Sequence, residues 1–142
     1  MGGLFEAVKL RAALRGAMEL VRTVNGYLAQ APWFGVINAD KTAAATTVYT
    51  ALCAIGSLKV LLAPFVPFSA ERVHRALGYE HPLFGAQHIV TYAERARTHE
   101  ALVYDATQAR GHWAPSAMTP GQRLEPPQPL YQKLEVPVVG VE

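Results

Sequence analysis

The stretch Asn25-Gly26-Tyr27-Leu28-Ala29-Gln30-Ala31-Pro32-Trp33 decides how the chain is arranged. It closes a region, residues 4–29, whose composition favours a helix and whose apolar residues recur at steps of three and four. Pro32 disfavours helical geometry at the residue before it, so we expect the helix to end about there. The expected apolar face consists of Leu10, Leu14, Ala17, Val21, Val24 and Leu28.

Trp33 follows this helix end and so lies near a surface loop. Two interpretations of it stay open. Large aromatic side chains are mostly buried, so Trp33 can be a plug beneath the loop. An indole carried by a loop can also stack on an unpaired base, and single-stranded loops are what RNA-binding proteins usually recognise.

A second helix is predicted from residue 41 to about residue 62, with Asp40 as its N-cap. Alanines widen its apolar face, which indicates burial on more than one side. Ala63-Pro64 ends it. Two such helices joined by a short link predict a mainly α protein, a partial antiparallel helical bundle.

The segment Pro64-Phe65-Val66-Pro67-Phe68 is predicted to be a rigid corner, anchored to the core by its two phenylalanines. A short third helix is expected to start at a Ser69 cap and to stop at Gly78.

The character of the chain changes after Tyr79, because seven of the ten prolines follow it and helical periodicity ends. We therefore predict two parts: a helical bundle over residues 1–79 and a proline-rich irregular tail over residues 80–142 that packs on the bundle. Short strands are expected at residues 102–104 and 134–138, the second at a sheet edge because of Pro137.

Length and composition bound the class of protein. The chain has 142 residues, 51% of them apolar, and a net charge of +2, which permits RNA contact without requiring it. Its single cysteine, Cys53, excludes an internal disulfide. No signal peptide is visible. The apolar run at residues 43–68 contains Lys59 and two prolines, so we expect no membrane span and a cytoplasmic location.

Catalytic and metal chemistry find no support in the spacing of the residues. The five histidines lack zinc-site spacing, and no glycine-rich phosphate loop follows a strand. We therefore name no catalytic residue and no metal ligand.

A basic face offers a different chemistry. Arg11, Arg15 and Arg22 fall within about 40° of one another on a helical wheel, away from the apolar face. They are either a solvated charged face or donors to RNA phosphates. Asn25 either bonds locally near the helix end or orients the turn that carries Trp33, and the structural role is preferred.

Three blocks of the sequence resemble the anticodon domain of methionyl-tRNA synthetases, in order and with fitting gaps over roughly residues 6–135. The first block is Asn25-x-Tyr27-Leu28, Ala31-Pro32-Trp33 and Asp40-Lys41; the second is Leu61 to Arg72 followed by Leu77-Gly78-Tyr79; the third is Trp113-Ala114-Pro115, Pro120-Gly121 and Pro126 to Leu134.

The resemblance implies recognition of the anticodon loop of methionine tRNA. Trp33 would stack on a splayed base, while Arg11, Arg15, Arg22 and Lys41 would hold the RNA backbone. The parent enzyme would use ATP and magnesium in a catalytic domain, and that domain's His-x-Gly-His and Lys-Met-Ser-Lys-Ser signatures are not in this sequence. The chain also starts after the family's earlier helix, whose Asn and Arg read the anticodon.

Two alternatives stay open. The chain can be a packing module that binds no RNA by itself. It can also be the anticodon domain of a sister synthetase for valine, isoleucine or leucine.

Overall fold

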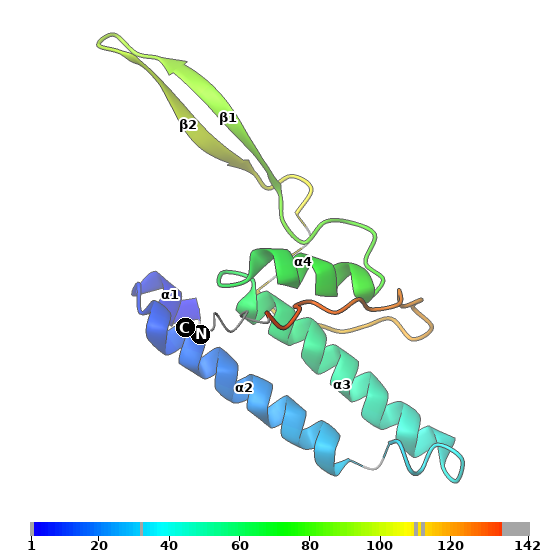
Figure 1. The fold of residues 1–142 in the computed structure, drawn as a ribbon. Coiled ribbons are helices and arrows are strands. Elements are labelled where there is room, and N and C mark those ends of the chain that lie inside the picture. Colours follow the sequence, from blue (N-terminus) through cyan, green and yellow to red (C-terminus); the bar gives the residue numbers. More distant parts are fainter. Residues whose placement is uncertain (1, 32, 110, 112, 135–142) are drawn as a thin grey trace, which may run out of the picture.

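A computed structural model describes residues 2–31, 33–109, 111 and 113–134 of the chain. Over these residues the mainly α architecture is confirmed: a helical hairpin with a shorter crossing helix, plus one two-stranded antiparallel sheet (Figure 1). The elements are α1 Gly2–Glu6, α2 Leu10–Gln30, α3 Lys41–Leu62, α4 Pro67–Ala76, β1 Ala86–Ala93 and β2 Thr98–Asp105.

The first helix ends where predicted but does not start where predicted. Ala31 has extended geometry, with φ −73° and ψ 129°, as expected for a residue before proline. Pro32 itself lies outside the described residues. At the other end the expected helix over residues 4–29 is wrong, because α1 and α2 are separated by a turn in which Val8 has φ 54°. This left-handed conformation interrupts the helical path.

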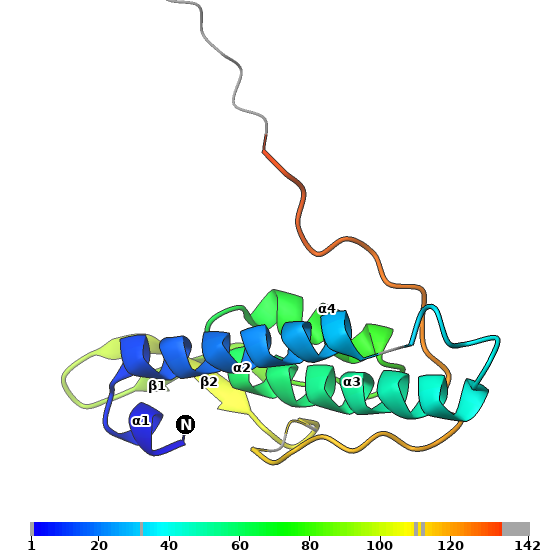
Figure 2. The same cartoon turned by 90° about the horizontal axis from the view of Figure 1, so that it is seen from below.

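Helices α2 and α3 lie side by side as two long antiparallel rods (Figure 2). The residues they bury are small, and no large side chain of the described chain is fully buried. Ala13 and Ala17 are the buried residues of α2. The apolar face that we expected is therefore only partly confirmed, since Leu10 and Leu14 remain exposed at its N-terminal end.

Helix α3 begins as predicted, because the Asp40 side chain accepts a hydrogen bond from the Ala43 backbone N–H at 2.9 Å. Its 22 residues are long and apolar enough to cross a membrane by length and composition alone. The prolines of the apolar run fall after its last residue, so they do not interrupt it. The central helix of a soluble bundle has the same properties, and α3 contacts both α2 and α4.

Helix α4 starts three residues earlier than predicted. Its N-cap is Val66, so the Ser69 cap is wrong, and the Ser69 hydroxyl instead shares a hydrogen bond with the Tyr131 hydroxyl at 2.6 Å. The corner is anchored by one phenylalanine rather than two. Phe65 packs on Phe5 with ring centres 5.6 Å apart, while Phe68 is 86% exposed. The predicted stop at Gly78 is confirmed, with φ 82°.

We expected the region after residue 79 to be irregular, but part of it forms two paired strands. Strands β1 and β2 pair from Ala86↔Asp105 to Ala93↔Thr98 and extend away from the helices (Figure 1). The strand expected at residues 102–104 is part of β2, and β1 was not predicted. Of the second expected strand only Leu134 lies among the described residues, and it is not in a strand.

Two contacts hold the base of the strand pair to α4. The Glu71 carboxylate accepts the Leu83 backbone N–H at 3.0 Å, and the Leu83 side chain is buried in a cluster with Ala63 and Ala70.

Residues 119–134, which we call the C-terminal strap, return along α4. The Arg72 guanidinium donates to the carbonyl oxygens of Leu130 at 2.9 Å and Pro129 at 2.8 Å. Farther along, the Glu125 backbone N–H donates to the Ala76 carbonyl at 3.0 Å. These bonds join the strap to α4, while the division into a bundle over residues 1–79 and a tail packed on it over residues 80–142 stays a prediction.

Replacing Arg72 by alanine removes both bonds to the strap, and we expect the strap to open more often. Exposed charged hydrogen bonds of this kind contribute about 1 kcal/mol, so chymotrypsin should cleave after Tyr131 about fivefold faster. Arg75→Ala is the matched control, because Arg75 pairs with Glu71 on its own helix at 3.3 Å. Equal cleavage rates in the two variants would contradict the role of Arg72.

Candidate nucleic-acid interface

The loop between α2 and α3 carries Trp33 at one end of the helical hairpin. The indole is half-buried, and its Nε1–H donates to the Leu28 carbonyl at 3.3 Å. The hydrogen bond fixes the ring against the last turns of α2. Trp33 also lines a hollow of about 380 Å³ at the start of α3, whose other walls are Ile37, Lys41, Ala44, Ala45 and Val48. The structure thus brings Trp33 and Lys41 together.

Phe34 is the aromatic residue that the sequence interpretation missed. Its side chain is 80% exposed, and its ring meets the Trp33 ring edge-on with centres 5.5 Å apart. The signal was present in the sequence, because Phe34 follows Trp33 directly in a loop where no helical periodicity would bury it. A free aromatic ring at a loop is a surface on which any base can stack.

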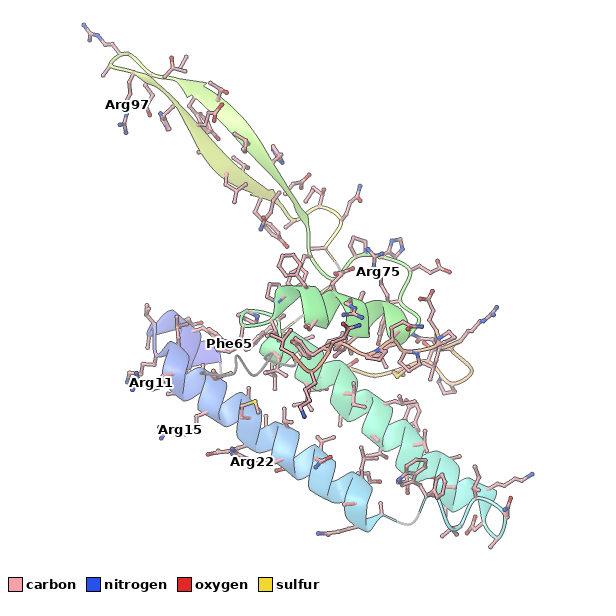
Figure 3. All side chains as sticks on the ribbon, viewed as in Figure 1. Arg11, Arg15, Arg22, Phe65, Arg75 and Arg97 are labelled. Carbon is pink, nitrogen blue, oxygen red and sulfur yellow. The ribbon has the colours of Figure 1, made fainter. Side chains whose placement is uncertain are left out.

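The three arginines lie on the outer side of α2, pointing away from α3 (Figure 3). Arg11, Arg15 and Arg22 are all exposed. Asn25 is also exposed, inside α2 rather than at its end, and helical geometry places it within about 80° of the three arginines. Asn25 therefore continues the arginine row towards the loop. The C-cap of α2 is Ala31, and the local bonding and turn-orienting roles of Asn25 stay predictions.

This arrangement suits an elongated anion. The row from Arg11 to Asn25 is about 21 Å long at the helical rise, and it leads towards Phe34 and Lys41. Guanidinium groups along the row can donate to successive phosphates, and the aromatic end can take unpaired bases. Phosphate contacts of this kind position a nucleic acid, while contacts to bases give sequence preference.

Metal binding finds no matching set of side chains in the part of the chain that the structure describes. No three His, Cys, Asp or Glu side chains gather there in a way that could hold an ion.

Comparison with known proteins agrees with the chemistry of this surface. A family model described as the anticodon binding domain of methionyl tRNA ligase matches residues 2–105. The chain is 50% identical to a methionine–tRNA ligase of Thermomicrobium roseum over 145 residues, covering 100% of this chain and 24% of the relative. It is 41% identical to one of Roseiflexus sp. over 141 residues, covering 98% and 24%. No solved structure matches.

The chain spans about a quarter of the length of the curated relatives it matches. The family model covers the helical hairpin, α4 and both strands, and every relative named above is a ligase for methionine. The alternative of a synthetase for valine, isoleucine or leucine is not supported by these matches. The chain belongs to the family of anticodon-binding domains of methionyl-tRNA ligases.

Proposed function

We propose that this chain binds the anticodon loop of methionine tRNA through the loop end of the α2–α3 hairpin. The observation that carries the proposal is the exposed Phe34 ring, held edge-on against Trp33 in the same loop that leads to Lys41. A base splayed out of the anticodon loop would stack on this aromatic pair. Stacking on one aromatic ring contributes about 1–3 kcal/mol per base.

In this proposal the two aromatic residues have different roles. Trp33 is half-buried and bonded to Leu28, so it shapes the loop as well as offering part of its ring. Phe34 lacks such burial and presents a free face. The stacking role that we expected for Trp33 thus extends to Phe34.

The arginine row would hold the RNA backbone. Arg11, Arg15 and Arg22 lie on one outer side of α2 (Figure 3), and all three are exposed. Each would neutralise a phosphate and release counterions, which adds affinity without sequence preference. Asn25, at the loop end of the row, is placed to donate to the RNA where the backbone leaves the row.

The ligation itself belongs in this proposal to the part of the longer relatives that the chain does not cover. The family resemblance implies that the parent enzyme joins methionine to its tRNA with ATP and magnesium. This chain's own part in the proposal is binding of the tRNA through the α2–α3 loop and the arginine row. We infer that a catalytic domain is its second partner and that both act in the cytoplasm, where tRNA is charged.

Replacing Phe34 by alanine should weaken binding of a methionine-tRNA anticodon stem-loop about 5- to 150-fold, because one stacked base is lost. The thermal midpoint should hardly change, because the ring is mostly exposed. Trp33→Phe keeps an aromatic ring but loses the bond to Leu28, so it should lower the thermal midpoint as well as the affinity. Fluorescence titration and thermal unfolding measure the two effects.

The control ligand is a stem-loop with a scrambled anticodon. Equal affinity of the unaltered chain for both stem-loops would favour the alternative of a packing module without recognition of its own. If the affinity of Phe34→Ala for the stem-loop is unchanged, the proposal that a base stacks on Phe34 is wrong.

Replacing Arg15 by glutamine should weaken binding of both stem-loops alike. The slope of log affinity against log salt should become shallower by about 0.7, because one phosphate contact is lost. Lys9→Gln, at a basic residue next to but not within the row, is the control. A loss confined to the methionine stem-loop would show that Arg15 reads bases instead.

A further inference from the structure

A hollow of about 500 Å³ lies between the end of α3, α4 and the segment before the strap. Lys59 of α3 forms one wall and His74 of α4 another. Tyr79, Leu83, Pro115 and Ser116 are among the other lining residues. The nucleic-acid proposal uses none of these residues. Lys41, which lines the hollow beside Trp33, lies about 27 Å from Lys59 along α3, so the two hollows are separate.

Lys59 is the unusual member of this lining because its side chain is 6% exposed. Its Nζ lies 3.9 Å from the centre of the Tyr79 ring. The ion pairs of the described residues do not include Lys59. A buried lysine without an anion is rare, and an ammonium group has three protons to donate. The ring and the end of α3 stabilise the positive charge but accept none of these protons in a strong bond.

Burial makes the positive charge of Lys59 less stable than that of an exposed lysine. Burial lowers the pKa of Lys59 to about 8, and the carboxylate of Glu71 acts in the opposite direction. Glu71 is already engaged, since it accepts the Leu83 N–H at 3.0 Å and pairs with Arg75 at 3.3 Å. Lys59 therefore stays mostly protonated at pH 7 and faces the hollow as a cation.

His74 adds no second charge. Its ring stacks on Tyr79 with centres 4.5 Å apart, and Nε2–H donates to the His81 carbonyl at 2.9 Å. Burial and the neighbouring Lys59 lower the pKa of His74. Among the described residues Nδ1 has no hydrogen-bond partner. The Tyr79 ring thus lies between the Lys59 ammonium and the His74 imidazole, and two further titratable groups of the lining, Glu80 and His81, are exposed.

We propose that this hollow binds a small monocarboxylate with an apolar or aromatic body. A single buried ammonium matches one carboxylate, and the apolar lining residues Val60, Leu83, Ala114 and Pro115 match an apolar body. The volume lies in the range typical of small-molecule sites, which are mostly apolar with a few polar groups. A phosphate dianion would need more donors than this lining offers.

The test uses the four lysines of the chain as internal controls. With ¹³C-labelled lysine, NMR titration gives the pKa of each side chain in the unaltered protein. Benzoate should raise the pKa of Lys59 by about 1 to 3 and leave those of Lys9, Lys41 and Lys133 unchanged. Benzamide, which has the same body without the charge, and inorganic phosphate are the control ligands.

Calorimetry of Lys59→Met checks the same site, since methionine keeps the length of the side chain and removes the charge. Benzoate should bind the unaltered chain and not the variant, while both bind the anticodon stem-loop equally. An unmoved Lys59 pKa, equal binding of benzamide or phosphate, or benzoate binding that survives in Lys59→Met would overturn the proposal. The NMR result decides if the variant does not fold.

Discussion

The close approach of α2 and α3 through small side chains is the constraint on which the rest of the structure depends. The fully buried residues of α2 are alanines, and α3 also buries Ala44 and Ala51. Small residues let two helices pack at short distance, but they bury little apolar area each. The packing of the two helices therefore depends on the fit of small side chains, and the larger apolar side chains stay partly exposed. The antiparallel pairing places the Trp33 loop at one end and the Lys59 hollow towards the other.

Helix α4 is the second organising element, because it holds two other segments of the chain, the residues before β1 and the strap. Glu71 binds the chain before β1, Arg72 binds the strap, and His74 binds the His81 carbonyl. A short helix of ten residues thus connects parts of the chain that lie up to about 60 residues apart. The strand pair itself has both faces largely exposed, and it depends on these tethers since an isolated hairpin is marginal in water.

Local chemistry made several features predictable from the sequence. The end of α2 before Pro32, the Asp40 cap and the Gly78 stop each depend on one residue and its neighbours. The missed features depend on distant partners. Ser69 bonds to Tyr131, 62 residues away, and Leu10 is exposed because the contact with α3 falls on the alanines. Among the candidate site residues, the arginine row followed from helical periodicity. Phe34 was missed although the sequence contains a signal for it, since it follows Trp33 in a loop without helical periodicity.

The proposed binding surface combines Trp33, which is held against α2 by its bond to Leu28, with the exposed ring of Phe34. The most direct test is an NMR map of backbone amide shifts during titration with the methionine-tRNA anticodon stem-loop. The account predicts that shifts concentrate at residues 33–41 and along the row from Arg11 to Asn25, and that a scrambled loop removes those at residues 33–41 only. Shifts confined to the strand pair, or identical maps for the two loops, would contradict it.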